Sequence, residues 1–90
     1  MSGTRQLKIV NEKGLHARAS AKFVECVEEF DAQAEVTKDG MTVSGDSIMG
    51  LLMLGASRGT FIEVATTGLQ AAALADALEA LVANRFGEDR

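Results

Sequence analysis

The first half of the chain contains both of the periods that distinguish strands from helices. In residues 6–10, Leu7 and Ile9 alternate with polar neighbours, and this period of two predicts a half-buried strand. Residues 11–14 interrupt the alternation. In residues 17–30, apolar side chains recur at helical spacing between charged ones, which predicts a helix of about three to four turns. The apolar positions of that helix are Phe23, Val24, Val27 and Phe30.

Two more alternating runs, residues 34–38 and 41–44, are joined by Asp39-Gly40. This dipeptide accepts the positive φ of a tight turn at little cost, so the segment predicts a β-hairpin. Ser47 then precedes the apolar run 48–54 as an N-cap residue would. The run therefore predicts a short helix.

Alternation resumes after Gly59 and ends at residues 67–68, which predicts a strand with Ile62 and Val64 on one face. The segment from Leu69 to about residue 82 is rich in alanine and predicts a further helix. Its apolar stripe consists of Leu74, Ala77, Leu78, Leu81 and Val82.

The predicted order of elements is βαββαβα, without a linker or an internal repeat. Such an order favours an α+β open-faced sandwich in one domain, residues 1–90, with three helices on one face of a four-stranded, mainly antiparallel sheet. The other face of the sheet is expected to be largely exposed to solvent, with Phe61 as an apolar contact at its edge.

Composition narrows the possible partners and surroundings. The net charge of −4 and the scattered phenylalanines argue against nucleic-acid binding. Cys26 has no second cysteine with which to pair, which favours a reducing compartment. We expect its side chain to have a packing role. No segment has the length or apolar content of a signal peptide or a membrane span, so we expect a cytoplasmic protein without membrane insertion.

The single histidine, His16, lies between the first predicted strand and the first predicted helix. Neutral imidazole is a nucleophile near pH 7, and a helix start offers free N–H groups and a positive dipole to an anion. With Arg18 nearby, His16 is therefore a candidate phosphoryl acceptor. On chemistry alone, an inert solvated or capping histidine is the favoured interpretation. A metal site is disfavoured, because the chain has no second histidine and no cysteine cluster.

Two motifs resemble one known family. Residues 11–24, with Gly14-Leu15-His16-Ala17-Arg18, resemble the active-site signature of the histidine-containing phosphocarrier proteins (HPr) of the bacterial phosphotransferase system. Residues 45–55 resemble the second motif of the family, a regulatory serine that opens a short helix. The resemblance extends over nearly the whole chain, and the family fold has the βαββαβα order predicted above.

The resemblance implies a role for each residue of the first motif. His16 would carry the phosphoryl group on the ring nitrogen nearer the backbone, and Arg18 would contact that group. The backbone N–H groups of Ala17 and Arg18 would complete the anion site. Ala19 departs from the family, which commonly has proline there, and this change is expected to loosen the helix start without removing a functional group.

The resemblance also implies partners. The phosphoryl donor would be an Enzyme I-type protein and the acceptor an EIIA-type protein, and Ser47 would be a phosphorylation site for a kinase of the HPr kinase/phosphorylase type. No cofactor is expected, and the protein is expected to be a monomeric carrier rather than an enzyme. In the short helix, Ile48, Leu51 and Leu54 are expected to supply the buried stripe. The expected docking residues are Ala17, Ala21, Ile48, Met49, Leu52 and Met53.

Other functions stay open at this level. A nitrogen-type (NPr-like) phosphocarrier that acts on regulatory targets would have the same active-site motif. A regulatory binding module switched by Ser47, with no role for His16, belongs to another class of protein. A purely structural α+β domain would be phosphorylated at neither residue.

Overall fold

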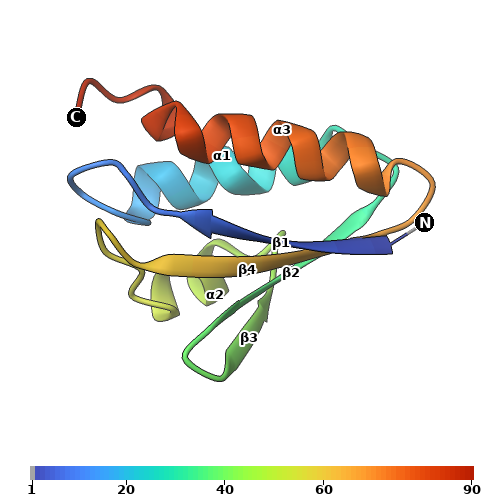
Figure 1. Cartoon of the computed structure of the whole chain (residues 1–90), viewed down its shortest axis with the longest axis horizontal. Helices are drawn as coiled ribbons and strands as arrows, with labels where there is room; N and C mark the ends of the chain where they lie inside the picture. Colours follow the sequence, from blue (N-terminus) through green and yellow to red (C-terminus); the bar gives the residue numbers. More distant parts are fainter. Residues whose placement is uncertain (1) are drawn as a thin grey trace.

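A computed structural model describes residues 2–90, which form four strands, three α-helices and one short 3-10 helix (Figure 1). Their order, βαββαβα, confirms the prediction. The longest helix has 13 residues, and none between residues 2 and 90 is long and apolar enough to cross a membrane. The elements are β1 (Ser2–Lys8), α1 (Ala17–Glu28), β2 (Gln33–Lys38), β3 (Met41–Ser44), α2 (Ile48–Met53), β4 (Phe61–Thr67), α3 (Ala71–Ala83) and η1 (Arg85–Gly87).

The strands form one antiparallel sheet in the order β1-β4-β2-β3. Leu7 of β1 lies opposite Ile62 of β4, and Val36 of β2 lies opposite Val64 of β4. All four side chains are buried, because alternate residues of paired strands face the same side of a sheet. Phe61 is exposed, as expected for the opposite face. The predicted α+β open-faced sandwich is confirmed.

The three helices cover the buried face of the sheet. Helices α1 and α3 pack side by side, and α2 packs against α1 and β3 (Figure 1). Phe23 of α1, Leu51 of α2 and Leu74 of α3 are fully buried in the same core. Cys26 lies at the margin of this core, where burial and, to a lesser degree, the charge of Glu29 raise the pKa of its thiol. The thiol therefore stays protonated near neutral pH.

The predicted hairpin between β2 and β3 is confirmed in its turn as well as in its strands. Asp39 and Gly40 both have left-handed backbones, with φ values of 51° and 82°. Two successive residues of this kind form the turn whose twist matches that of antiparallel strands. The hydroxyl groups of Thr37 and Thr42, which lie opposite each other, are 2.7 Å apart.

The first strand begins earlier than predicted, at Ser2 rather than at residue 6. Residues 2–5 show no apolar alternation, but they pair with β4 along their whole length. Arg5 points toward the helices, where its Nη1 lies 2.7 Å from Asp76 Oδ1 and 2.8 Å from Glu79 Oε1. These carboxylates raise the pKa of the guanidinium, chiefly through hydrogen bonds. Tertiary pairing, rather than local pattern, therefore extends this strand.

Two predicted helix ends are also wrong by two residues. Helix α1 ends at Glu28, so Phe30 lies in the following loop. Helix α3 begins two residues after Leu69, which is 84% exposed. Helix α3 starts late because Gln70 contacts a distant loop: it hydrogen-bonds to Asp31 through both its backbone N–H and its side-chain oxygen. These bonds hold the segment outside the helix.

Candidate functional site

The loop between β1 and α1 carries His16 and is tightly packed. Gly14 has a left-handed backbone with φ of 66°, and a Cβ atom there would lie only 2.4 Å from the carbonyl oxygen of Ala56. The N–H of Leu15 donates to the same oxygen at 2.8 Å, and the Leu15 side chain is buried. Glycine is therefore required at position 14, and the backbone on the N-terminal side of His16 is fixed against the segment that precedes β4.

His16 is the N-cap residue of α1, but its side chain makes no capping hydrogen bond. The first backbone bond of the helix runs from Ser20 N to the His16 carbonyl oxygen at 2.8 Å. The N–H groups of Ala17 and Arg18 precede that bond and lie at the positive end of the helix dipole. The imidazole is 27% exposed. An anion that reaches the ring can therefore also meet backbone donors.

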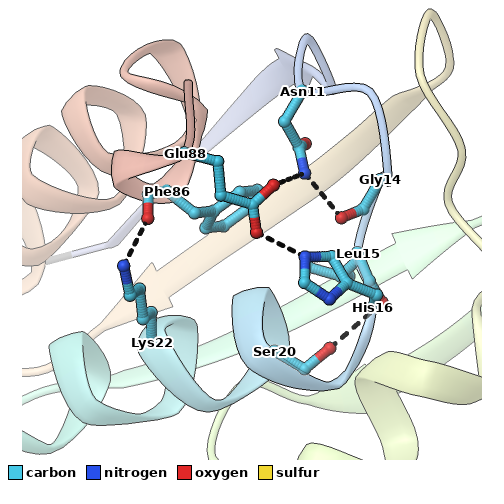
Figure 2. Close-up of polar contacts among 8 residues, drawn as sticks. All are labelled: Asn11, Gly14, Leu15, His16, Ser20, Lys22, Phe86 and Glu88. Atoms are coloured by element: carbon cyan, nitrogen blue, oxygen red, sulfur yellow. Dashed lines mark hydrogen bonds and ion pairs between the residues drawn. The ribbon is translucent and has the colours of Figure 1, made fainter. Parts of the chain in front are cut away.

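One edge of the imidazole is occupied by a carboxylate from the C-terminal tail. His16 Nε2 hydrogen-bonds to Glu88 Oε2, and Asn11 Nδ2 donates to Glu88 Oε1 at 3.0 Å (Figure 2). Asn11 Nδ2 also donates to the Gly14 carbonyl oxygen at 2.8 Å, so it joins the tail to the loop. Within residues 2–90, no hydrogen bond is made to His16 Nδ1.

The carboxylate of Glu88 is stabilised in its charged form. Burial by itself raises the pKa of this group, but the hydrogen bonds that it accepts from Asn11 and His16, together with the positive charge of Lys13, outweigh burial. The net effect is a pKa below the ordinary value of glutamate. Glu88 is therefore ionised at neutral pH and can only accept hydrogen bonds.

The tail that carries Glu88 is anchored at the residues just before it. Phe86 is fully buried in the core, and its carbonyl oxygen accepts a hydrogen bond from Lys22 Nζ of α1 at 2.7 Å (Figure 2). Arg85 and Phe86 have left-handed backbones, with φ of 57° and 55°, so the chain turns sharply after α3. This turn directs the tail across α1 toward His16.

Arg18 does not contact His16 directly. It is exposed, no hydrogen bond or ion pair joins it to His16 in the described part of the chain, and it lines an open cleft of about 510 Å³ together with Glu88. This cleft shares Glu12, Asp89 and Arg90 with an adjoining one, so the two lie at the same end of the molecule. The basic side chains that line the two clefts, here called the basic end, are Lys8, Lys13, Arg18, Lys22, Arg58, Arg85 and Arg90.

The basic end stands out because the chain as a whole is acidic, with a net charge of −4. Only three acidic side chains, Glu12, Glu88 and Asp89, line the same two clefts. Most of the thirteen acidic residues therefore lie on other surfaces, and the charge of the molecule is polarised.

Among residues 2–90, no group of three or more histidine, cysteine, aspartate or glutamate side chains is arranged to hold a metal ion.

Ser47 occupies the predicted N-cap position of α2. Its hydroxyl oxygen accepts a hydrogen bond from Gly50 N at 3.0 Å. A Cβ atom at Gly50 would lie 2.9 Å from the Cβ of Val43, so glycine in this helix allows α2 to approach β3 closely. The glycine is explained by packing, and the capping role of Ser47 is confirmed.

The apolar surface of α2 differs from the prediction at one residue. Leu51 and Leu54 are buried as expected, but Ile48 is 40% exposed and is not part of the buried stripe. The reason is the shortness of the helix, which turns only one narrow side toward the core. Met49 and Met53 are 69% and 66% exposed. Of the other expected docking residues, Ala17 is exposed, and Ala21 and Leu52 are half-buried.

The structure brings together residues that the sequence did not indicate, namely Asn11, Lys22, Phe86 and Glu88. A buried anchor could have been suspected from Phe86, an isolated apolar residue that follows the last helix. No local pattern indicates the contact between His16 and Glu88, because 72 positions separate the two residues.

A histidine at a helix start without a side-chain cap, on an open-faced α+β sandwich, is compatible with a class of protein that carries an anionic group such as a phosphoryl group. Comparison with known proteins agrees. The family model described as the phosphorylation site of the PTS HPr component matches residues 4–84. The phosphocarrier protein HPr of Neisseria meningitidis is 45% identical over 84 residues, which cover 93% of this chain and 94% of that protein.

Two further relatives broaden the comparison. The phosphocarrier protein NPr of Shewanella violacea is 40% identical over 84 residues, covering 93% of this chain and 92% of that protein. The crystal structure of HPr-C-His from Thermoanaerobacter tengcongensis superposes with a TM-score of 0.92 at 35% identity, covering 98% of this chain and 99% of that one. The chain belongs to the HPr family of phosphocarrier proteins of the phosphotransferase system, which are carriers rather than catalysts and act with Enzyme I and EIIA proteins.

Proposed function

We propose that His16 is the residue that carries the phosphoryl group, accepting it on Nδ1 from an Enzyme I-type donor and passing it to an EIIA-type acceptor. One observation carries the proposal. His16 lies at the uncapped start of α1, inside the segment that matches the phosphorylation-site model of the family. Nδ1 is the ring nitrogen without a hydrogen-bond partner in the described structure, so its lone pair is available to attack.

Arg18 and the backbone at the start of α1 are proposed to receive the phosphoryl oxygens. The Arg18 side chain is exposed and makes no ion pair between residues 2 and 90, so it can move toward a phosphate on His16 without breaking an existing contact. A guanidinium matches phosphate oxygens in geometry and charge. The N–H groups of Ala17 and Arg18 are proposed to donate to the same oxygens.

The partner surface is proposed to combine apolar and charged contacts. Ile48, Met49 and Met53 form an exposed apolar patch on α2, next to α1. Methionine adapts to partners of different shape, and exposed apolar clusters commonly mark interaction sites. Ala17, Ala21 and Leu52 extend the patch toward His16. The basic end would then favour partners with an acidic surface around their own reacting group.

The phosphoryl site is tested with Enzyme I and phosphoenolpyruvate. We expect an acid-labile adduct that mass spectrometry under alkaline conditions maps to His16, and no adduct on His16→Ala. A phosphorylated His16→Ala variant would refute the assignment. Arg18→Ala is expected to slow transfer to or from the carrier without unfolding it, whereas Lys38→Ala, which removes a basic residue outside the two clefts, is expected to leave both rates unchanged.

Ser47 is proposed as a second phosphorylation site, modified by a kinase of the HPr kinase/phosphorylase type. A phosphate at the start of α2 would suit the helix dipole but would place negative charge beside Ile48 and Met49, where partners are proposed to dock. Phosphorylated protein should therefore bind its partners more weakly. To test this, wild type, Ser47→Ala and the matched control Ser57→Ala are treated with such a kinase. Wild type and Ser57→Ala should be phosphorylated and bind partners more weakly afterwards, and Ser47→Ala should not. Unchanged transfer by the Ser47-phosphorylated protein would contradict the regulatory role.

The similarity to an NPr protein favours a second candidate, a nitrogen-type carrier. Parallel transfer assays with a sugar-type and a nitrogen-type EIIA acceptor distinguish the two functions. The faster acceptor identifies the branch.

A further inference from the structure

We propose that Glu88 is a positioning residue for phosphoryl transfer, because it holds the proton of the neutral imidazole on Nε2 and so leaves Nδ1 as the nucleophile. The proposal rests on the function proposed for His16 and adds a residue that lies outside the matched family segment, residues 4–84. A residue of the tail would thereby select which ring nitrogen reacts.

The geometry determines which group donates the hydrogen bond. An ionised carboxylate has no proton to give, so the bond between His16 Nε2 and Glu88 Oε2 requires the hydrogen on Nε2. A neutral imidazole carries only one N–H, so Nδ1 then holds a free lone pair. Without this partner, both tautomers would be populated and part of the molecules would present a protonated Nδ1.

The carboxylate is held in place from two directions. Asn11 Nδ2 donates to its second oxygen, Oε1, at 3.0 Å and ties it to the loop that carries His16 (Figure 2). Phe86, buried two residues earlier, and the bond from Lys22 Nζ to the Phe86 carbonyl oxygen anchor the tail. The lowered pKa of Glu88 keeps it ionised at neutral pH. The other charged residues that line the cleft with it are Glu12, Lys13, Arg18, Lys22, Asp89 and Arg90.

The transfer step balances with this arrangement. A bond forms between His16 Nδ1 and phosphorus, while the bond between phosphorus and the leaving atom of the donor breaks and the leaving atom keeps the electron pair. The proton on Nε2 stays in its hydrogen bond to Glu88. The ring becomes cationic as Nδ1 is substituted, and the adjacent carboxylate compensates that positive charge.

The tautomer is measured without any phosphorylation. Nitrogen-15 chemical shifts of the His16 ring at neutral pH are expected to show hydrogen on Nε2 in the wild type and a mixture of tautomers in Glu88→Ala. Glu88→Gln keeps the size of the side chain, but an amide can donate as well as accept, so it is also expected to give a mixture. Glu28→Ala, which removes an exposed glutamate at the other end of α1, should leave the ring unchanged.

The rate of phosphoryl acceptance is the second measurement. With Enzyme I and phosphoenolpyruvate, Glu88→Ala is expected to accept about tenfold more slowly, the rate equivalent of one hydrogen bond to a charged group. Glu28→Ala should match the wild type, and unfolding curves confirm that each variant is folded. A wild-type tautomer or a wild-type rate in Glu88→Ala overturns the role of Glu88 and leaves the phosphoryl site intact. An adduct that persists in His16→Ala instead refutes the phosphoryl site itself.

Discussion

Replacing Gly14 with alanine tests whether close packing of the loop fixes the position of His16. Two costs are expected. The left-handed backbone at φ of 66° costs about 1 kcal/mol for any residue with a Cβ atom. The new Cβ would also lie 2.4 Å from Ala56 O, the oxygen that accepts the Leu15 hydrogen bond, and relieving such overpacking costs about 1–3 kcal/mol. We therefore expect a loss of about 3 kcal/mol in the free energy of unfolding.

Gly55 provides a matched control for this experiment. Its φ of 61° is nearly the same, but a Cβ atom there would have no neighbour within 4 Å. Gly55→Ala should therefore carry only the backbone cost of about 1 kcal/mol. Urea unfolding of the two variants and the wild type measures the difference. Equal losses for Gly14→Ala and Gly55→Ala would refute the claim that contact with Ala56 fixes the loop.

Three further predictions concern the tail and the second helix. Phe86→Ala is expected to reduce the free energy of unfolding by about 3–5 kcal/mol, because the ring is fully buried; a loss below about 1 kcal/mol in urea unfolding would argue against a tail anchored in the core. Ser47→Ala should lower the free energy of unfolding by about 1 kcal/mol, because the hydrogen bond from Gly50 N is lost. Urea unfolding measures this, and an unchanged value would show that the cap does not contribute to stability. Because the pKa of Glu88 is lowered by folding, its ionised form contributes stability above pH 4.5, the ordinary glutamate value, and this contribution is lost as the pH falls through the folded pKa. The difference in unfolding free energy between wild type and Glu88→Gln should thus narrow in acid. A difference independent of pH would contradict the claim that the ionised form of Glu88 stabilises the fold.

Local patterns were sufficient to predict most of the fold. The alternation at Ile62 and Val64 and the turn at Asp39-Gly40 depend on neighbouring residues only, and both are found as predicted. His16 could be placed at a helix start because a break in the strand pattern directly precedes a helical one. Sequence periodicity therefore predicts an element and its buried face when the element's own residues determine both.

Features that depend on distant partners were missed or misplaced. Strand β1 begins at Ser2 because β4 pairs with it, and Leu69 lies outside α3 because its neighbour Gln70 bonds to Asp31. Glu88 reaches His16 only because the tail turns across α1 after α3, a path that local composition does not encode. These features arise from tertiary contacts that override local preference.

The polarised charge has a consequence for how the molecule meets another protein in solution. At an ionic strength of about 0.15 M, electrostatic fields decay over about 8 Å. The molecule measures 33 × 27 × 20 Å, so most of its acidic surface is screened from a protein that approaches the basic end. A partner with an acidic surface is attracted locally to the basic end. At long range the two molecules would still repel each other if both carry a net negative charge. Moderate salt would then assist their encounter, because it suppresses the long-range repulsion. Only high salt would weaken the local attraction.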